Sequence, residues 1–276
     1  MVSIKSQPEG DDIMSSSYKG AVFFDLDGTL FDDDKHVSDR NLLALDLLRE
    51  NDILPIIATG RNQFEISDTI EAGKFDSFIT ANGSYVVLEG KPIDVQVIPE
   101  QINTNLVAYA SHFNEEVAFY NNVGCAVSGD NKLVDENYKA LGLKKIIDPD
   151  YYKNHDINFS FVYTPVGEDD HQKGYEEIFG RDLTFYRNNP RGLDVVLKGV
   201  SKAGGIISLI EHAGLEGIPT YAFGDGNNDI PMFKHVDNPI AMRNGLTIAK
   251  QNAKYITKED NNHSGIYYEL RDLKLI

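Results

Sequence analysis

Four short polar segments, each following a predicted apolar strand, constrain the fold of this chain more than any other feature of its sequence. The segments are Asp25-Leu26-Asp27-Gly28-Thr29, Ala58-Thr59-Gly60-Arg61, Gly199-Val200-Ser201-Lys202 and Gly224-Asp225-Gly226-Asn227-Asn228-Asp229. In open α/β sheets the carboxyl ends of the parallel strands lie along one edge, and ligands bind there. We therefore predict that the four segments, although far apart in the sequence, form a single site.

Alternating strands and helices surround these segments. Apolar runs and helical periodicity predict strands at 21–26, 53–58, 77–80, 194–197 and 220–223, and helices at 39–50, 61–72 and 202–213. Ser38 stands directly before the first of these helices, where its side chain suits an N-cap. The alternation predicts an α/β fold with a doubly wound parallel sheet of the Rossmann-like type.

Residues 84–190 interrupt this alternation. A hairpin is predicted about Glu89-Gly90-Lys91-Pro92, and short strands with intervening helices follow it. We therefore predict an α+β domain at 84–190, inserted into a core that is formed by 18–83 and 191–276.

Composition narrows the range of functions. The 276 residues include 26 Lys and Arg against 43 Asp and Glu, and this net charge of −17 argues against nucleic-acid binding. A small anionic substrate remains compatible, because a bound cation can reverse the charge within one cleft. No apolar run is long enough for a membrane-spanning helix, and the polar residues 1–17 predict a mobile N-terminal extension. The single cysteine, Cys125, excludes a disulfide within the chain and favours a reducing, cytoplasmic location.

The first polar segment carries two carboxylates directly after a strand. Asp25 is suited to act as a nucleophile that forms an acyl phosphate. Asp27 is suited to protonate the leaving oxygen and then to activate the water that hydrolyses the intermediate. Gly28 allows a sharp turn. Taken alone, the segment also fits a polar turn that caps a strand.

The other three segments supply groups that complement a phosphate. The Thr59 hydroxyl, with backbone N–H groups at a predicted helix start, suits a phosphoryl oxygen. Lys202 would neutralise charge between carboxylates, and Asp225 is a natural ligand for Mg²⁺ at the end of a strand. Asn228 and Asp229 would orient phosphate, water or Lys202. Each segment alone also fits an ordinary alternative, namely a helix cap, a solvated lysine and an Asp/Gly/Asn turn.

In the order DLDGT, TGR, VSK and GDGNND, the sequence resembles the haloacid dehalogenase (HAD) superfamily of phosphatases. More narrowly, it resembles the Cof-type members, which carry a C2-type (type IIB) α+β cap. The resemblance implies a Mg²⁺-dependent phosphomonoester hydrolase that works through a phospho-aspartate intermediate. The implied substrates are small phosphorylated metabolites such as sugar phosphates, nucleotides or cofactor phosphates.

The resemblance also implies a role for individual residues. Asp25 would be the nucleophile and Asp27 the acid and base. Magnesium would be held by the Asp25 carboxylate, the Asp27 backbone carbonyl and Asp225, with Asp229 supporting the metal shell. Phosphate or substrate would be bound by Leu26, Thr59, Gly60, Lys202 and Asn228. Positions expected near the substrate mouth are Arg61, Asn82, Gly83, Arg187 and Asn188, with Asn189 and Arg191 as further cap residues that equally fit a polar interdomain linker.

Two other functions fit the same fold. A phosphosugar mutase would have to rebind a phosphorylated sugar, and the sequence shows no basic cluster in residues 84–190 for that purpose. A non-catalytic sugar-phosphate-binding regulator would have no need of the intact Asp25, Asp27, Lys202 and Asp225. The sequence does not select one substrate, and it predicts no oligomeric state.

Overall fold

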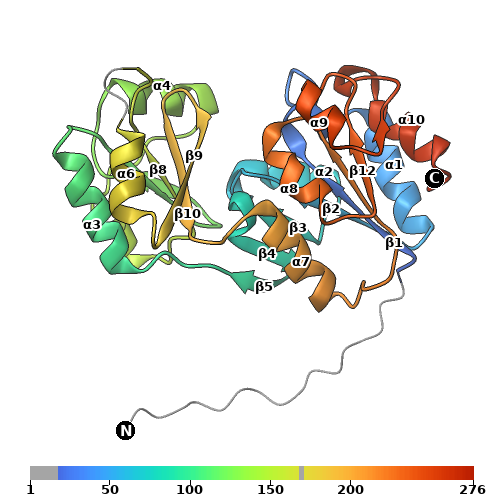
Figure 1. Ribbon diagram of the computed structural model, residues 1–276, viewed down its shortest axis with the longest axis horizontal. Helices are drawn as coiled ribbons and strands as arrows, with labels where there is room; N and C mark the ends of the chain where they lie inside the picture. Colours follow the sequence, from blue (N-terminus) through green and yellow to red (C-terminus); the bar gives the residue numbers. More distant parts are fainter. Residues whose placement is uncertain (1–17, 168–170) are drawn as a thin grey trace, which may run out of the picture.

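The computed structural model describes residues 18–167 and 171–276, and Figure 1 shows that they form two bodies side by side. The predicted N-terminal extension, 1–17, lies outside the described residues. The larger body is built on an eight-stranded sheet and the smaller one on a five-stranded sheet. The chain passes from the larger body into the smaller one and back.

The large sheet contains the predicted parallel strands. Its strands are β1 (Gly20–Phe24), β2 (Ile53–Ala58), β3 (Phe78–Thr80), β4 (Tyr85–Leu88), β5 (Lys91–Val95), β11 (Thr220–Gly224), β12 (Asn238–Ala241) and β13 (Tyr255–Ile256). They lie in the order β13-β12-β11-β1-β2-β3-β4-β5. The six strands from β13 to β3 are parallel, whereas β4 and β5 pair antiparallel at one edge. The predicted α/β core with a parallel sheet is confirmed.

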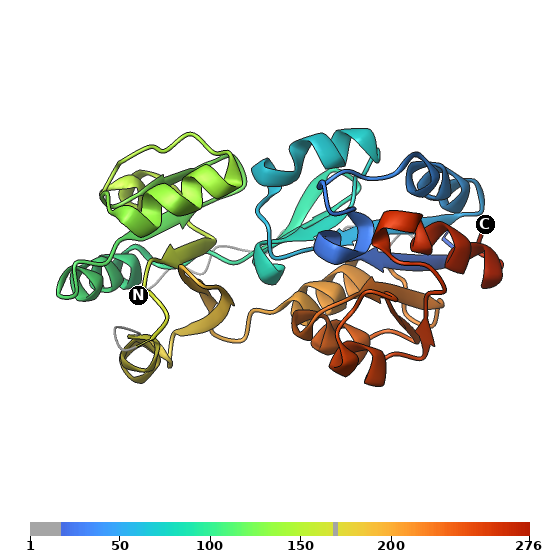
Figure 2. The same ribbon diagram turned by 90° about the horizontal axis from the view of Figure 1, so that it is seen from above.

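Helices cover both faces of the large sheet, as the view in Figure 2 shows. The helices are α1 (Asp39–Glu50), α2 (Ser67–Ala72), α7 (Lys202–His212), α8 (Ile230–Phe233), α9 (Thr247–Gln251) and α10 (Gly265–Asp272). Successive side chains of a strand point to opposite faces, so Val22 and Phe24 join one buried cluster while Ala21 and Phe23 join the other. Ser38 caps α1 as predicted, because its hydroxyl accepts a hydrogen bond from the Asn41 N–H at 3.3 Å.

The smaller body is the inserted α+β cap. Its strands are β6 (Val117–Tyr120), β7 (Cys125–Val127), β8 (Phe159–Val162), β9 (Leu183–Asn189) and β10 (Gly192–Leu197), and its helices are α3 (Glu100–Ser111), α4 (Lys132–Leu141), α5 (Tyr151–Asn154) and α6 (Gln172–Phe179). The strands lie in the order β7-β6-β8-β10-β9 and pair antiparallel. Val117 and Phe119 face the cluster that includes α3 and α6, whereas Ala118 and Tyr120 face the opposite cluster.

Strand pairing moves both predicted domain boundaries. The hairpin β4–β5, predicted to begin the cap at residue 84, pairs with β3 and extends the core sheet. Strand β10, predicted to return the chain to the core from residue 191, pairs with β8 and β9 in the cap sheet. The chain therefore leaves the core after β5 and re-enters it after Leu197.

One helix boundary also differs from the prediction. The helix expected from Arg61 instead starts as a 3₁₀ turn at Gln63–Ile66 and continues into α2. Asn62 and Glu65 form a capping box, in which the Glu65 carboxylate accepts hydrogen bonds from the Asn62 backbone and side chain. The segment Thr59-Gly60-Arg61 is therefore a loop, and only Asn62 separates it from the helical turn.

Candidate active site

The first predicted carboxylate lies at the carboxyl end of the central strand. The Asp25 N–H donates to the Phe223 carbonyl at 3.0 Å, which continues the pairing of β1 with β11. The chain then turns through a π turn, η1 (Leu26–Leu30), in which Gly28 has a φ of +75°. A Cβ on residue 28 would lie 2.6 Å from an Asp225 carboxylate oxygen. Gly28 is therefore required both for the turn and for the close approach of Asp225.

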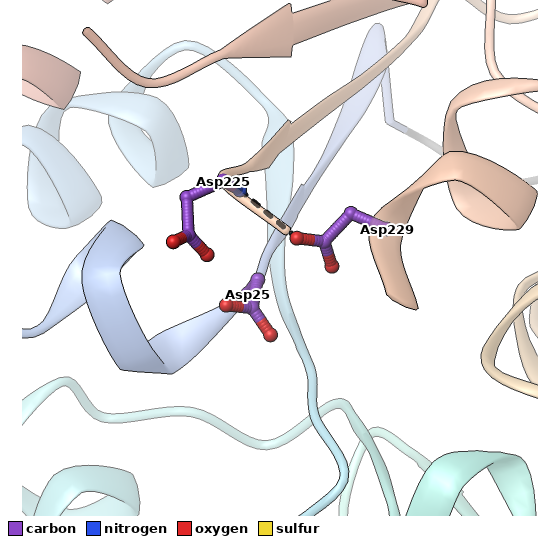
Figure 3. A group of neighbouring side chains, drawn as sticks. All are labelled: Asp25, Asp225 and Asp229. Carbon is purple, nitrogen blue, oxygen red and sulfur yellow. Dashed lines mark hydrogen bonds between the residues drawn. The ribbon is translucent and has the colours of Figure 1, made fainter. Parts of the chain in front are cut away.

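Three carboxylates converge at this edge of the sheet (Figure 3). Asp25, Asp225 and Asp229 each offer an oxygen atom, and these atoms lie within 4.8 Å of one another. Asp229 is completely buried, and its Oδ2 accepts hydrogen bonds from the N–H groups of Asp225 and Gly226 at 2.9 and 3.0 Å. Hard carboxylate oxygens in this arrangement fit a divalent cation. The residues present are therefore compatible with the metal that the sequence predicts.

Lys202 joins two of these carboxylates. Its Nζ lies 2.8 Å from Asp25 Oδ1 and 2.7 Å from Asp229 Oδ1, and the residue is only 4% exposed. Burial alone would lower the pKa of this lysine, but the two carboxylates outweigh burial and raise it. The Ser201 hydroxyl accepts a hydrogen bond from the Gly204 N–H and caps α7, which fixes Lys202 at the first position of the helix.

One lysine does not neutralise three aspartates, and the pKa values of Asp25 and Asp225 reflect this excess of negative charge. Burial, followed by repulsion from Asp229, raises the pKa of Asp25 to about 7 although Lys202 opposes the shift. The same two causes raise the pKa of Asp225 to about 6. A bound cation would relieve this repulsion and displace the protons that the cluster otherwise retains.

Asp27 points to a different set of partners. Arg61 binds its carboxylate through two hydrogen bonds of 2.7 Å, and Lys35 Nζ lies 2.7 Å from Oδ1. Burial raises the pKa of Asp27, but Arg61 and Lys35 outweigh it and hold the pKa below its ordinary value. In this structure Asp27 is therefore held as a carboxylate, two residues along the chain from Asp25.

Lys35 is a site residue that the sequence prediction missed. It lies in a short hairpin after η1, which the bridge between Phe31 and Val37 closes. Its φ of +65° places it in the left-handed region. A lone lysine in a polar loop carries no motif, so only the tertiary structure reveals that it reaches Asp27.

A cleft of ≈ 620 Å³ lies between the core and the cap, with the carboxylates on its core side. The predicted site residues that line it are Asp25, Asp27, Thr59, Gly60, Arg61, Asn82, Asp225 and Asn228. Lys202 and Asp229 lie beneath Asp25, as their burial shows. The structure thus brings all four polar segments together. Three of them follow strands of the core sheet as predicted, whereas the segment that carries Lys202 follows β10 of the cap sheet.

Thr59 and Gly60 form the part of the cleft closest to Asn82. The Thr59 hydroxyl accepts a hydrogen bond from the Arg61 N–H at 3.1 Å, and Thr59 is 2% exposed. A Cβ on residue 60 would meet Asn82 Oδ1 at 2.9 Å. Because the helical turn starts only at Gln63, a phosphoryl group here would meet loop N–H groups, and the predicted helix terminus is not at this position.

Two predicted site residues, Leu26 and Gly83, are absent from the cleft lining. The Leu26 side chain is completely buried in the apolar core, so only its backbone is near the site. Gly83 is absent from the cleft lining and has a φ of +98° in the turn η3 (Ala81–Gly83). A Cβ on residue 83 would overlap the carbonyl oxygen of Ser201. The turn thereby supports the segment that carries Lys202.

Of the cap residues predicted near the substrate mouth, some line the cleft and others do not. Arg187 is also absent from the cleft lining, and its guanidinium donates to the Gln172 side chain and the Thr164 carbonyl, both at 3.1 Å. The Asn188 side chain lies outside the described part of the chain. Asn189 does line the cleft, whereas Arg191 does not.

The sequence also missed most of the cap wall of the cleft. Its unpredicted members are Asn137, Leu141, Phe159, Phe161 and Asp194. These side chains come from α4, β8 and β10, and no motif marks them. In the sequence of β8, Phe159 and Phe161 alternate with Ser160, and this pattern indicates a strand whose two aromatic side chains share one face.

Substitution of Gly83 tests how the core supports Lys202. Gly83→Ala combines a left-handed backbone, which costs about 1–2 kcal/mol for an L-residue, with the overlap on Ser201, which adds about 1–3 kcal/mol. Gly90→Ala is the matched control, because Gly90 also has a positive φ, +76°, but nothing lies within 4 Å of its added Cβ. Urea unfolding should show a larger loss of stability for Gly83→Ala, and equal losses would refute a packing role for Gly83.

Comparison with known proteins agrees with the site. The sequence model of the haloacid dehalogenase-like hydrolases matches residues 22–270. YkrA of Bacillus subtilis, which carries a provisional phosphatase name, is 30% identical over 260 residues and covers 92% of this chain and 98% of its own. YcsE of Bacillus subtilis, a 5-amino-6-(5-phospho-D-ribitylamino)uracil phosphatase, is 27% identical over 258 residues, with 91% of this chain and 96% of its own covered.

A solved structure extends the similarity to three dimensions. The HAD subclass IIB sugar phosphatase BT4131 superposes with a TM-score of 0.77 at 25% identity, over 93% of this chain and 99% of its own. A parallel core with converging aspartates and an inserted cap defines a phosphatase of the HAD type. This chain belongs to the haloacid dehalogenase-like hydrolase family, as the resemblance in its motifs implies. Within the described residues, every helix is too short or too polar to span a bilayer.

Proposed function

We propose that this protein is a Mg²⁺-dependent phosphomonoester hydrolase that forms a phospho-aspartate intermediate on Asp25. The arrangement of Asp25, Lys202, Asp225 and Asp229 at the core side of the cleft carries this proposal. Asp25, the Asp27 backbone carbonyl and Asp225 would hold the metal, and Asp229 would orient them. When bound, the metal would offset the negative charge of the phosphoryl group and the aspartates.

The residues then account for two chemical steps. A carboxylate oxygen of Asp25 attacks phosphorus, the ester P–O bond breaks, and Asp27 donates its proton to the leaving oxygen. A water molecule then loses a proton to Asp27 and attacks the same phosphorus, which breaks the Asp25–phosphate bond and releases inorganic phosphate. Lys202 offsets charge on the phosphoryl group throughout. Thr59, Gly60 and Asn228 line the space in which its oxygens would lie.

The partners of Asp27 suit its two roles. Held by Arg61 and Lys35, it is ionised and ready to accept a proton from water. A substrate phosphoryl group would compete for both cations. Once Arg61 and Lys35 leave the Asp27 carboxylate, burial is the main remaining influence on its pKa and raises it. A raised pKa favours the protonated form of Asp27, which the first step needs.

Small phosphorylated metabolites are the substrate class that we propose. The relatives named above include a 5-amino-6-(5-phospho-D-ribitylamino)uracil phosphatase and a sugar phosphatase. A cleft of ≈ 620 Å³ lies within the size range of small-molecule sites.

The buried free thiol of Cys125 agrees with a reducing, cytoplasmic location. A phosphosugar mutase on the same fold is the alternative, which an isomerisation assay with hexose phosphates distinguishes.

Removal of the metal tests this function directly. Purified protein is incubated with a panel of phosphorylated sugars, nucleotides and cofactors, together with an aryl phosphate, and released phosphate is measured. We expect release with Mg²⁺, loss of release in EDTA, and recovery when Mg²⁺ is added back in excess. Release that persists unchanged in EDTA would contradict the metal requirement. Binding of a sugar phosphate without any release would favour the regulator.

A further inference from the structure

The segment 26–37 carries two cleft residues, Asp27 and Lys35. It begins as the turn η1 and continues into the hairpin that the bridge between Phe31 and Val37 closes. The two cleft residues contact each other across the segment, with Lys35 Nζ 2.7 Å from Asp27 Oδ1. The position of both side chains therefore depends on how the segment is fixed to the rest of the core.

Asn261 donates two hydrogen bonds into this segment from the turn η5 (Asn261–His263), which precedes α10. Its Nδ2 lies 3.0 Å from the Phe31 carbonyl oxygen and 3.2 Å from Asp33 Oδ1. The two hydrogens of one amide group thus hold two points of the segment. Asn261 is only 3% exposed, so water does not readily replace these bonds when they are lost.

Asn244 extends the attachment toward the catalytic carboxyl group. Its Nδ2 donates to the Gly28 carbonyl at 2.7 Å, and its Oδ1 accepts a hydrogen bond from the Asn261 N–H at 3.2 Å. Gly28 directly follows Asp27 in the chain. The two asparagines therefore form a continuous path of hydrogen bonds from η5 to the residue beside Asp27.

The turn η5 is braced on its own side. The Asp260 carboxylate caps it by accepting a hydrogen bond from the His263 N–H at 3.1 Å. Asn262 Oδ1 accepts a hydrogen bond from the Asp33 N–H at 2.9 Å, which adds a third amide to the contact with the hairpin. These bonds make η5 a firm support on which Asn261 can act.

We propose that Asn261 is a positioning residue, which holds the segment 26–37 so that the Asp27 carboxyl group meets the leaving oxygen of the ester. This inference rests on the proposed phosphatase function, in which Asp27 donates that proton, and it assigns a role outside the four polar segments. Asn261 does not line the cleft and acts through the segment. A displacement of about 1 Å at a reacting group can cost up to about a hundredfold in rate.

An isosteric substitution tests this role. Asn261→Asp keeps the shape of the side chain, removes both donated hydrogens and places a second carboxylate beside Asp33. Asn105→Asp is the matched control, because Asn105 is an exposed residue of α3 outside the cleft lining. Its Oδ1 accepts a hydrogen bond from Gln101 Nε2, and a carboxylate keeps that acceptor.

Two aryl phosphates of similar shape separate a misplaced acid from a general loss of structure. Phenolate is a strong base and needs a proton as it leaves, whereas 4-nitrophenolate leaves without one. We compare kcat/KM for phenyl phosphate and 4-nitrophenyl phosphate with Mg²⁺, because this constant covers the steps up to P–O cleavage. Asn261→Asp should lower the value for phenyl phosphate by roughly tenfold or more and that for 4-nitrophenyl phosphate by no more than about threefold.

The ratio of the two constants decides the outcome. Asn105→Asp should change neither constant by more than about twofold. If Asn261→Asp lowers both constants equally, or changes neither beyond the control, Asn261 does not position the acid and the inference is overturned. The proposed phosphatase function would stand in either case, since the wild type still releases phosphate.

A second variant covers the case in which Asn261→Asp does not fold. Asn244→Ala removes the donor to the Gly28 carbonyl from an exposed position. It should shift the ratio of the constants in the same direction by roughly threefold or more, because the other bonds of the segment remain. An unchanged ratio in this variant would contradict the path of hydrogen bonds from η5 to Asp27.

Hydrogen–deuterium exchange supplies a readout that needs no turnover. Peptides that cover 26–37 should exchange roughly tenfold faster in Asn261→Asp or Asn244→Ala than in the wild type, with unchanged exchange in β2. Unchanged exchange in 26–37 would overturn the inference. Absence of release from both esters by the wild type would count against the proposed function itself, so the two failures are distinguishable.

Discussion

Replacing Asp25 by Asn is expected to lower Mg²⁺-dependent phosphate release by roughly a thousandfold or more, the scale on which loss of a covalent nucleophile acts. The amide oxygen that this substitution introduces can still accept the hydrogen bond from Lys202, so the buried contact at 2.8 Å keeps an acceptor. An amide oxygen is a poor nucleophile toward phosphorus, however, and no acyl phosphate forms. Single-turnover measurement of released phosphate, with saturating substrate, gives the size of the effect.

The control for this prediction makes the same chemical change elsewhere. Asp68→Asn converts an exposed aspartate at the start of α2, outside the cleft lining, and should leave phosphate release within about twofold of the wild type. Thermal unfolding of both variants checks that each is folded. If Asp25→Asn releases phosphate as fast as Asp68→Asn, Asp25 is not the nucleophile.

Replacing Lys202 by Met is the second substitution with a large expected effect. It leaves Asp25 and Asp229 buried without their cation, and breaking a buried ion pair costs about 3–5 kcal/mol. We expect this loss in the free energy of unfolding when metal is chelated, together with loss of phosphate release. Excess Mg²⁺ should restore part of the stability, because a cation bound to the carboxylates replaces part of the lost charge.

The pH dependence of this variant follows from the direction of the pKa shifts. The pKa of Asp25 is already raised above its value in the unfolded chain, and loss of Lys202, which lowers it, would raise it further. The folded variant then binds more protons than the unfolded chain, so its stability falls as pH rises toward the folded pKa. Urea unfolding in EDTA should show a larger deficit in the free energy of unfolding at pH 8 than at pH 5.

Lys198→Met provides the matched comparison for Lys202. Lys198 is exposed and lies directly after β10, so its loss should change the free energy of unfolding by no more than about 0.5 kcal/mol. If Lys202→Met loses no more free energy of unfolding than Lys198→Met, or if Mg²⁺ does not change that loss, Lys202 does not hold the carboxylate cluster together.

The core of the site was predictable because it depends on strand ends. Asp25 follows β1 and Asp225 follows β11, and these neighbouring parallel strands place both residues at one edge of the sheet. Lys202 begins the helix α7, where a capped first turn fixes its position. These placements need only the alternation of elements and local capping, and both are visible in the sequence.

The parts that depend on pairing across the fold were not predictable in this way. The hairpin β4–β5 reads as the start of the cap, yet the register that pairs Phe78 with Val87 adds it to the core sheet. Lys35 reaches Asp27 only because the hairpin after η1 folds back over the site. Helix α10 was also missed, since its N-cap, Ser264, has a left-handed backbone and resembles part of a turn.

Arg187 was predicted near the substrate mouth but does not line the cleft, and the sequence contained a signal against that prediction. Leu183 and Phe185 pack into the cluster that includes α3 and α6. Side chains two residues apart on a strand share a face, so Arg187 was bound to continue on that side. Its hydrogen bonds to Gln172 and Thr164 agree with this placement. The strand period therefore argues against Arg187 at the mouth, but it does not extend to Asn189, which lines the cleft where the pairing of β9 with β10 is irregular.

Trapping the covalent intermediate tests the central claim most directly. Asp27→Asn removes the base that activates water. An aryl phosphate with a good leaving group needs no general acid, so with this ester and Mg²⁺ the acyl phosphate should still form on Asp25 and should then persist. The reaction is quenched, the acyl phosphate is reduced with borohydride, and the modified residue is located by peptide mass spectrometry. We predict that reduction converts Asp25 alone. Modification of another residue, or phosphate release by the wild type with no trapped adduct on Asp25 in the variant, would contradict the phospho-aspartate mechanism.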